Sequence, residues 1–279
     1  MSAKILDGKI VRDKIAEKLK AEISRLSSKP KLAIIQVGDL PQSNTYIRQK
    51  ILFGQKIGAL VDHLKLNENI TQKELISKLL TLNSNQSVHG LIVQLPIPKH
   101  LDKDKLIDAI DPAKDVDGQT ATNIKMLFEG SPAGYIPATT KGILTLLDFY
   151  KITVGGKKVT VVGRSSLVGK PTALALLNLN ATVTVCHSQT KNLKLETRNA
   201  DILIVATGKP NLITAEHVSP GQVVIDVGIN VLANSQKNLV GDVKFDEVAK
   251  IVDAITPVPG GIGPMTVASL FENLLKAYK

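Results

Sequence analysis

The 279-residue sequence has one cysteine, Cys186, no tryptophan, four tyrosines and five phenylalanines. A single cysteine excludes an internal disulfide framework and is typical of a reducing compartment. No apolar run approaches the ~20 residues that a membrane-spanning helix needs. The amino terminus lacks the apolar core and the small-residue cleavage site of a secretory signal. We therefore expect a globular protein of the cytoplasm that does not enter a membrane.

The charge is positive, since 35 basic residues face 25 acidic ones and give a net charge of +10. Such a balance favours anionic ligands. A nucleic acid is one such ligand, but the lysines are scattered, and the few aromatic residues offer little stacking surface for bases. A solvated lysine-rich surface that accepts small anions is the favoured interpretation, and no nucleic-acid partner is expected.

Helical patterns alternate with short β-branched runs along the whole chain, which predicts an α/β fold with largely parallel strands. In the first half, residues 9–26 have the spacing of an amphipathic helix, and residues 31–37, 59–66 and 88–95 have the composition of buried strands. A turn-rich stretch at 111–123 interrupts this pattern.

A second α/β series follows, with strands expected at 157–163, 181–186, 200–206 and 223–228. We therefore expect two α/β lobes. The first domain is predicted to span residues 1–138 and the second 139–264. The last helix, 265–279, is expected to pack back on the first domain.

The segment VVGRSSLVGKPTALALL predicts a nucleotide-binding turn. A strand ends at Gly163, a turn follows, and a helix is expected near Lys170 with Pro171 in its first turn. Backbone N–H groups at such a helix start can bind a pyrophosphate. The spacing from Gly163 to Gly169 departs from G-x-G-x-x-G, so a plain strand-to-helix turn is the alternative.

The next expected strand favours NADP over NAD. Sites that prefer NAD place a carboxylate about 20 residues after the first glycine, to bind the ribose 2′-hydroxyl. Here the strand ends in His187 and Ser188, without a carboxylate. Arg164 and the Ser188 hydroxyl suit a 2′-phosphate instead. An arginine that is merely exposed on a turn is the simpler alternative.

Four polar residues in the first half are candidates for chemistry. Tyr46 and Lys50 are four residues apart and would share a helix face. Gln94 ends an expected strand, at the edge where α/β sites form. Asp117 lies in the turn KDVDG. Each has an ordinary explanation, because such pairs arise by chance and strand ends and turns often carry polar residues.

Several other chemistries are disfavoured. The chain has no H-E-x-x-H, C-x-x-C or G-x-S-x-G motif. The acidic turn fails as a calcium loop, because alignment on Gly118 puts Ala113 and Ile124 at the first and last ligand positions. The five histidines show no metal-ligand spacing. No metal cofactor is expected.

The ordered combination of motifs resembles the bifunctional methylenetetrahydrofolate dehydrogenase/cyclohydrolase family over nearly the whole chain. The resemblance rests on VGDLPQSNTYIRQK, GLIVQLPIP, PAKDVDG, VVGRSSLVGKP, TVCHSQT, DVGIN and TPVPGGIGPMT. It implies a folate-binding catalytic lobe and a Rossmann-type NADP-binding lobe, with a cleft between them. It also implies oxidation of 5,10-methylenetetrahydrofolate to the 5,10-methenyl cation with NADP, followed by hydrolysis to 10-formyltetrahydrofolate.

The resemblance also assigns roles to residues in the first half. Lys50 would be the general acid/base and Gln94 would hydrogen-bond it. Tyr46 would stack on the folate, and Asp117 would anchor the pterin. Homodimerisation and folate substrates, with or without a polyglutamate tail, are further implications.

In the second half, the resemblance assigns one set of residues to the cofactor and another to the substrate. The cofactor contacts would be Gly163, Arg164, Ser165, Ser188 and Ile229. Pro259 and Gly260, in the loop 257–263, would border the substrate.

The sequence departs from the family pattern at Gln119, Lys125 and Thr140. Gln119 and Lys125 lie beside the expected pterin anchor. The sequence therefore leaves open whether the folate affinity and the ratio of the two activities match those of the family. A monofunctional dehydrogenase or cyclohydrolase is therefore an alternative. Less favoured ones are a non-catalytic nucleotide- or RNA-binding protein and an unrelated NADP oxidoreductase that acts on a small acid.

Overall fold

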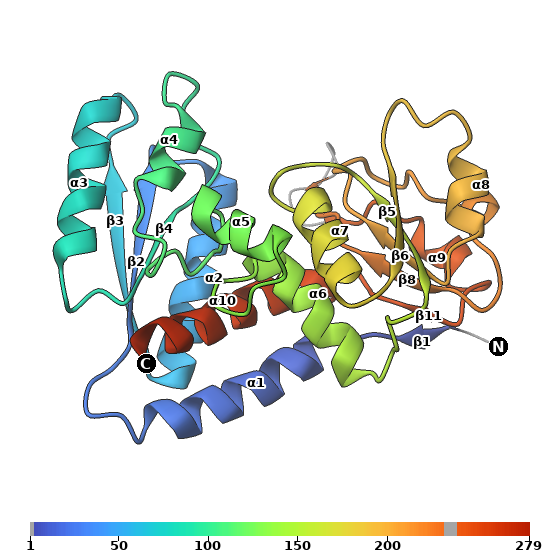
Figure 1. Ribbon diagram of the computed structural model, residues 1–279, viewed down its shortest axis with the longest axis horizontal. Coiled ribbons are helices and arrows are strands. Elements are labelled where there is room, and N and C mark those ends of the chain that lie inside the picture. Colours follow the sequence, from blue (N-terminus) through green and yellow to red (C-terminus); the bar gives the residue numbers. More distant parts are fainter. Residues whose placement is uncertain (1–2, 232–238) are drawn as a thin grey trace. The chain divides into compact units, whose positions relative to one another are not determined.

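The computed structural model describes residues 3–231 and 239–279, and it separates into two compact units (Figure 1). The first unit contains Asp13–Ala138 and Val267–Lys279. The second contains Thr139–Thr266 and the amino-terminal segment up to Arg12. The α/β class and the organisation in two α/β units, expected from the alternating patterns, are confirmed.

The first unit is built on a three-stranded parallel sheet in the order β3-β2-β4. Alternate side chains of β2 point to opposite faces, and Ala33, Ile35 and Val37 pack with Leu75 and Leu79 of α3 in one apolar core. The elements of this unit are β2 (Lys31–Val37), α2 (Pro41–Ile57), β3 (Leu60–Leu66), α3 (Gln72–Ser84), β4 (Gly90–Val93), α4 (Lys103–Asp108) and α5 (Ala121–Phe128).

The second unit is built on a six-stranded sheet in the order β1-β11-β8-β7-β5-β6, in which every pairing is parallel. A short antiparallel pair, β9–β10, lies outside it. The strands are β1 (Lys4–Ile5), β5 (Lys158–Val162), β6 (Thr182–Cys186), β7 (Ile202–Val205), β8 (Val223–Asp226), β9 (Asn230–Val231), β10 (Leu239–Val240) and β11 (Ala254–Ile255). The helices are α6 (Ala138–Phe149), α7 (Gly169–Asn178), α8 (Leu193–Arg198), the 3-10 helix η1 (Ala215–His217) and α9 (Phe245–Val248).

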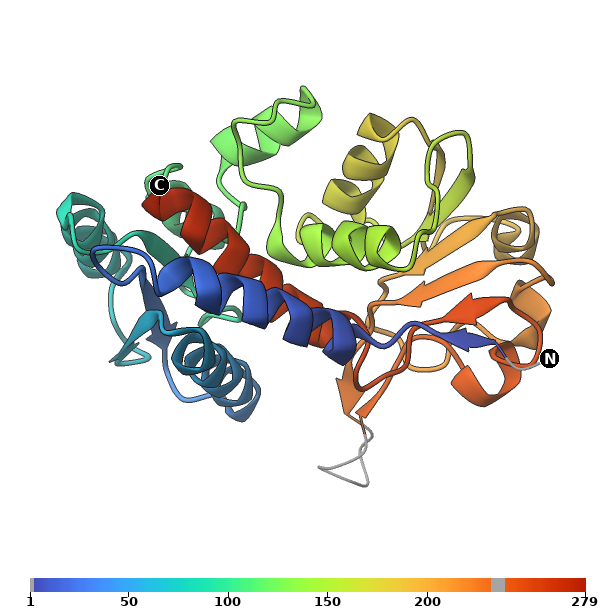
Figure 2. The same ribbon diagram turned by 90° about the horizontal axis from the view of Figure 1, so that it is seen from below.

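Two long helices, α1 (Gly8–Ile23) and α10 (Ile262–Tyr278), each begin in the second unit and end in the first. Their carboxyl-terminal ends lie side by side in the first unit, where Lys279 forms an ion pair with Glu22 at 2.9 Å (Figure 2). The Asn273 amide of α10 donates to the carbonyl oxygens of Val116 and Ile136. The end of the chain is thus packed into the first unit.

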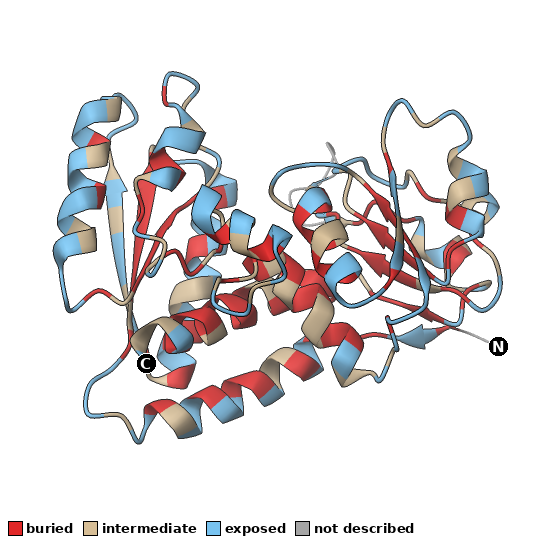
Figure 3. Cartoon of the chain, viewed as in Figure 1, coloured by how far each residue is buried: buried red, intermediate tan, exposed pale blue. Residues whose placement is uncertain are grey.

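One expectation needs correction. The segment 59–66 was predicted as a buried strand, but β3 is an edge strand whose residues are exposed or half-buried, because only β2 pairs with it among the described residues. The predicted domain bounds stay a prediction; in the structure, residues 3–12 group with the second unit, where β1 pairs with β11. Figure 3 shows buried residues concentrated in the strands β2 and β4 of the first unit.

None of the helices within residues 3–231 and 239–279 is long and apolar enough to cross a membrane.

Candidate active site and nucleotide site

Lys50 projects from α2, a helix whose two ends are fixed by its sequence. Pro41 stands in its first turn, where a missing N–H costs nothing. Gly58 ends it in the left-handed conformation at φ 83°, with its N–H bonded back into the last turn. Lys50 is half-buried, and its Nζ donates a hydrogen bond of 2.8 Å to Oε1 of Gln94. The predicted pair is therefore brought together from positions 44 residues apart.

Gln94 is fixed in one orientation. It follows β4, is 9% exposed, and its backbone N–H donates to the Ile35 carbonyl at 2.8 Å. Its Nε2 donates to the Leu95 carbonyl at 2.8 Å, which leaves Oε1 to face Lys50. An amide oxygen accepts equally from an ammonium or from a neutral amine. Gln94 can therefore hold Lys50 in place in either protonation state.

Asp117 is the charged neighbour of Lys50. Burial lowers the pKa of Lys50, and the Asp117 carboxylate opposes that shift. Burial raises the pKa of Asp117, which the Lys50 ammonium opposes and the nearby Asp115 carboxylate reinforces. Burial thus favours the neutral form of both groups, so Lys50 gives up its proton at a lower pH than a solvated lysine does.

The turn that carries Asp117 is rigid. Gly118 has a φ of +69°, and a Cβ there would lie 2.6 Å from the Tyr135 carbonyl oxygen, so only glycine fits. The buried Asp115 carboxylate accepts from the Thr120 N–H at 2.7 Å and from the Asn123 amide at 2.9 Å. These contacts hold the backbone before and after Asp117.

Gln119, one of the departures from the family pattern, touches the predicted pterin anchor. Its Nε2 donates to Oδ2 of Asp117 at 3.1 Å. The other departures lie elsewhere: Lys125 is exposed and pairs with Glu129 at 3.8 Å, and the buried Thr140 hydroxyl bonds that of Thr172 at 3.0 Å. Of the three, Gln119 alone bears directly on the site.

Tyr46 lies one helical turn before Lys50 on α2 and is 36% exposed. Partial burial raises the pKa of its phenol, so it stays neutral around pH 7. A half-exposed ring on the same helix as Lys50 can offer a flat apolar face to a planar ligand.

The predicted nucleotide turn connects β5 to α7. A Cβ at Gly163 would collide with the Ala206 carbonyl, and one at Gly169 would collide with the Gly163 carbonyl. The Ser165 hydroxyl oxygen accepts from the N–H groups of Val168 and Gly169 at 3.2 and 3.4 Å. Neither of these two contacts uses the hydroxyl hydrogen of Ser165. The two glycines let the turn pack closely against the protein backbone, and the helix that starts beside the turn offers N–H groups that suit a pyrophosphate. The helix begins at Gly169, one residue before the expected position.

Arg164 and Ser188 follow neighbouring strands. Val162 and Cys186 are register partners at the ends of β5 and β6, and the Gly163 N–H donates to the Cys186 carbonyl at 2.9 Å. Arg164 and Ser188 are both exposed just beyond these strand ends. An exposed guanidinium and a hydroxyl that follow neighbouring strand ends, without a carboxylate there, suit a phosphate group.

The other predicted residues also lie in the second unit. Ile229 follows β8 and is 40% exposed. Pro259 is exposed, whereas Gly260 is buried, has a φ of +117°, and accepts from the Gly8 N–H at 2.9 Å. The proposed role of Pro259 and Gly260 beside the folate stays a prediction, since Tyr46, Lys50, Gln94 and Asp117 all belong to the first unit.

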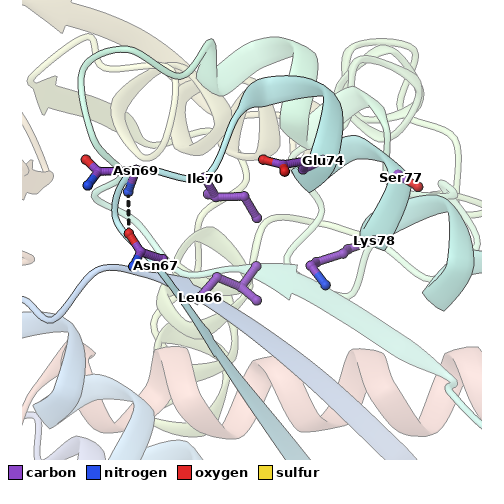
Figure 4. Close-up of a pocket in the computed structure, with 7 residues that line it drawn as sticks. All are labelled: Leu66, Asn67, Asn69, Ile70, Glu74, Ser77 and Lys78. Atoms are coloured by element: carbon purple, nitrogen blue, oxygen red, sulfur yellow. Dashed lines mark hydrogen bonds between the residues drawn. The ribbon is translucent and has the colours of Figure 1, made fainter.

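A surface depression of about 710 Å³ lies at the end of β3 and contains none of the predicted residues (Figure 4). Its Glu74 is engaged in capping α3, because its carboxylate accepts from the backbone and hydroxyl of Thr71. The lining residues are Leu66, Asn67, Asn69, Ile70, Glu74, Ser77 and Lys78.

Two family models match most of the chain. Residues 6–117 match the catalytic domain of tetrahydrofolate dehydrogenase/cyclohydrolase, and residues 137–279 match its NAD(P)-binding domain. The bifunctional protein FolD of Nautilia profundicola is 48% identical over 278 residues, which cover 99% of this chain and 97% of that protein.

Solved structures agree with these matches. The bifunctional FolD methylenetetrahydrofolate dehydrogenase/cyclohydrolase of Campylobacter jejuni is 46% identical and superposes with a TM-score of 0.97 over 99% of both chains. The FolD of Trypanosoma brucei, solved with NADP and an inhibitor, is 35% identical, with a TM-score of 0.95 over 100% of this chain and 98% of that one. With its two family domains in order and these full-length relatives, the chain belongs to the tetrahydrofolate dehydrogenase/cyclohydrolase family.

Proposed function

We propose that this protein carries out two consecutive reactions on one folate. It oxidises 5,10-methylenetetrahydrofolate to 5,10-methenyltetrahydrofolate with NADP, and it hydrolyses that cation to 10-formyltetrahydrofolate. The observation that carries the proposal is the half-buried Lys50–Gln94 hydrogen bond, with Asp117 beside it, in a chain that has both family domains. Retention of both the lysine and the nucleotide turn argues against the monofunctional alternatives.

For the oxidation, NADP held by the nucleotide turn would supply the hydride acceptor for the one-carbon bridge. The contribution of the protein is to hold the reactants in contact and to control the charge around them. The folate becomes a cation, so an ammonium at Lys50 would oppose the reaction. Burial lowers the pKa of Lys50 and favours its neutral form, which removes that opposition.

For the hydrolysis, neutral Lys50 accepts a proton from the attacking water. The water oxygen bonds to the bridge carbon, and the electrons of that carbon's C=N bond return to nitrogen. The new hydroxyl group releases its remaining proton to the solvent as the C=O bond forms, the bond from that carbon to N5 breaks, and N5 takes the proton held by the Lys50 ammonium. The formyl group stays on N10. The Gln94 oxygen faces Lys50 throughout and accepts from either protonation state. Asp117 offers carboxylate oxygens to the pterin, and Tyr46 offers its ring.

For the cofactor, Gly163 and the start of α7 would receive the pyrophosphate, with the Ser165 hydroxyl hydrogen available to a phosphate oxygen. Arg164 and Ser188 would bind the 2′-phosphate. Ile229 would contact the cofactor from the end of β8.

Replacing Arg164 by alanine is expected to raise the KM for NADP by about tenfold or more, because a hydrogen bond to a charged group contributes about 1.5–3 kcal/mol. The KM for NAD, which lacks the 2′-phosphate, should change little. Steady-state kinetics with both cofactors measure the difference. Arg198→Ala, at an exposed arginine of α8, is the control. Equal effects of Arg164→Ala on the two cofactors would exclude the 2′-phosphate assignment.

We further propose that the protein is a cytoplasmic homodimer that accepts polyglutamylated folates. The support for the dimer is the edge strand β6, where Val185 is 40% exposed, together with Leu177 in α7 and Leu179 just after it, at 56% and 44%. Burying such a surface against a second copy is favourable. Light scattering should give twice the chain mass of 30.0 kDa, and a monomeric mass would refute the dimer.

The polyglutamylated substrate has separate support, because the positive net charge of the chain suits a glutamate tail.

Product analysis tests the two-step proposal. The purified protein, given 5,10-methylenetetrahydrofolate and NADP, should form 10-formyltetrahydrofolate, identified by mass spectrometry. Salt-sensitive retention of RNA without folate turnover would instead support the non-catalytic alternative.

A further inference from the structure

Two buried carboxylates lie at the carboxyl end of the six-stranded sheet in the second unit. Neither has been given a role above. Asp226 ends β8 and is 3% exposed, and Asp242 follows β10 and is fully buried. Buried carboxylates are costly unless hydrogen bonds satisfy them, so their partners indicate what they hold in place.

Asp242 joins the chain segments that follow two neighbouring strands. Its Oδ2 accepts from the Thr207 N–H at 2.6 Å, the Thr207 hydroxyl at 2.9 Å and the Gly208 N–H at 2.9 Å. Its Oδ1 accepts from the Asn230 side-chain amide at 2.9 Å. Thr207 and Gly208 follow β7, whereas Asn230 begins β9, the next strand along the chain after β8, and β7 and β8 are adjacent in the sheet.

Asp226 supports this arrangement from behind. Its Oδ1 accepts from the Gly228 N–H at 2.9 Å and from the Asp242 N–H at 3.0 Å, and its Oδ2 accepts from the Val243 N–H at 2.9 Å. The approach is close, since a Cβ at Gly228 would collide with the Asp242 carboxyl group and one at Gly241 with that of Asp226. Asp226 and Asp242 therefore belong to one hydrogen-bonded cluster, the Asp226–Asp242 cluster.

Ile229, the proposed cofactor contact, lies between two residues that are hydrogen-bonded to the Asp226–Asp242 cluster. Gly228 before it is bonded to Asp226, and Asn230 after it is bonded to Asp242. Ligands of parallel α/β sheets bind beyond the carboxyl ends of the strands, where these segments lie. We propose that Asp242, backed by Asp226, is a positioning residue that fixes Thr207–Gly208 and Gly228–Asn230 as a preformed wall of the NADP site. This inference rests on the proposed function.

The chemistry makes a specific demand on the Asp242 side chain, because all four groups that contact its carboxylate are hydrogen-bond donors. An asparagine would keep one oxygen for the three donors of Thr207 and Gly208, but its NH₂ would then face the NH₂ of Asn230. The damage from Asp242→Asn is thus confined to the Asn230 side, next to Ile229. Exchanging the two side chains, as Asp242→Asn with Asn230→Asp, restores a donor opposite an acceptor.

The test is a fluorescence titration of the full chain with NADPH, alongside thermal unfolding of each variant. Asp242→Asn should raise the Kd for NADPH by about tenfold, and the exchange variant should return it to within about threefold of the wild-type value. Asp201→Asn is the matched control. Its carboxylate accepts from the Lys158 N–H at 2.8 Å at the amino end of β7, so it should leave the Kd unchanged.

A folded Asp242→Asn variant with the wild-type Kd would overturn the inference, whatever its melting temperature, because a merely structural role changes stability alone. If Asp242→Asn does not fold, Asn230→Ala decides: a raised Kd supports the inference and an unchanged Kd overturns it. If the wild-type protein itself binds no NADPH, the proposed function fails instead.

Discussion

Replacing Lys50 by methionine is expected to slow hydrolysis of 5,10-methenyltetrahydrofolate by about 10²–10⁴-fold, which is the usual contribution of a positioned general base. Methionine retains an unbranched stem but has no amine, so the bond to Gln94 and the proton acceptor are both lost. The loss of absorbance of the methenyl compound, corrected for its spontaneous hydrolysis, measures the rate. Near-normal hydrolysis by a folded variant would remove Lys50 from its assigned role.

Lys56→Met is the matched control, since Lys56 is an exposed lysine of the same helix that pairs with Asp13 at 2.7 Å. Its hydrolysis rate should equal that of the wild type. The pH profile adds a second criterion. The reactive form of Lys50 is neutral, so the wild-type rate should rise with pH as Lys50 loses its proton. Burial lowers the pKa of Lys50, so this rise should lie below the range of an ordinary lysine.

Replacing Asp117 by alanine is expected to raise the KM for the folate by about 10–100-fold, because charge-assisted hydrogen bonds to the pterin contribute about 1.5–3 kcal/mol each. The Kd for NADPH should not change, since Gly163 and Arg164 lie in the other unit. The substitution also removes the carboxylate that opposes the lowering of the Lys50 pKa. The rise of the hydrolysis rate should therefore move to lower pH.

Steady-state kinetics of hydrolysis between pH 6 and 9 would resolve both effects, with Asp104→Ala at an exposed aspartate of α4 as the control. Two results would contradict the assignment of Asp117. One is an unchanged folate KM in a folded variant. The other is an equal loss of NADPH binding, which would indicate a general folding defect.

The main strands could be predicted closely from the sequence, because β-branched runs bounded by glycine and polar residues define them locally. β2 spans the predicted residues 31–37, and β8 the first four of the predicted 223–228. The two-residue strands β1 and β11 could not be predicted, since pairing between positions far apart in the chain defines them. The exposure of β3 was also missed, because whether a strand lies at an edge depends on its partners rather than on its own residues.

The candidate site shows the same division. The spacing of Tyr46 and Lys50 indicated a shared helix face, but only the family resemblance suggested that Lys50 meets Gln94. Gln119 was expected beside the pterin anchor Asp117, but the hydrogen bond between their side chains was not predicted. Asp226 and Asp242 were missed as functional candidates. The sequence does carry a local signal for them, because each aspartate follows or interrupts an apolar run and has a glycine close by. Gly228 is two residues after Asp226, and Gly241 directly precedes Asp242.

The central claim is that one chain performs both reactions. The most direct test is a time course with 5,10-methylenetetrahydrofolate and NADP that follows NADPH and the absorbing methenyl compound separately, and compares NADP with NAD. The account predicts rapid NADPH formation, faster with NADP than with NAD, little lasting methenyl compound and a matching yield of 10-formyltetrahydrofolate. If the methenyl compound accumulates and is hydrolysed only at its spontaneous rate, the protein is a dehydrogenase alone, and attention would turn to Gln119. No reduction of either cofactor would contradict the account.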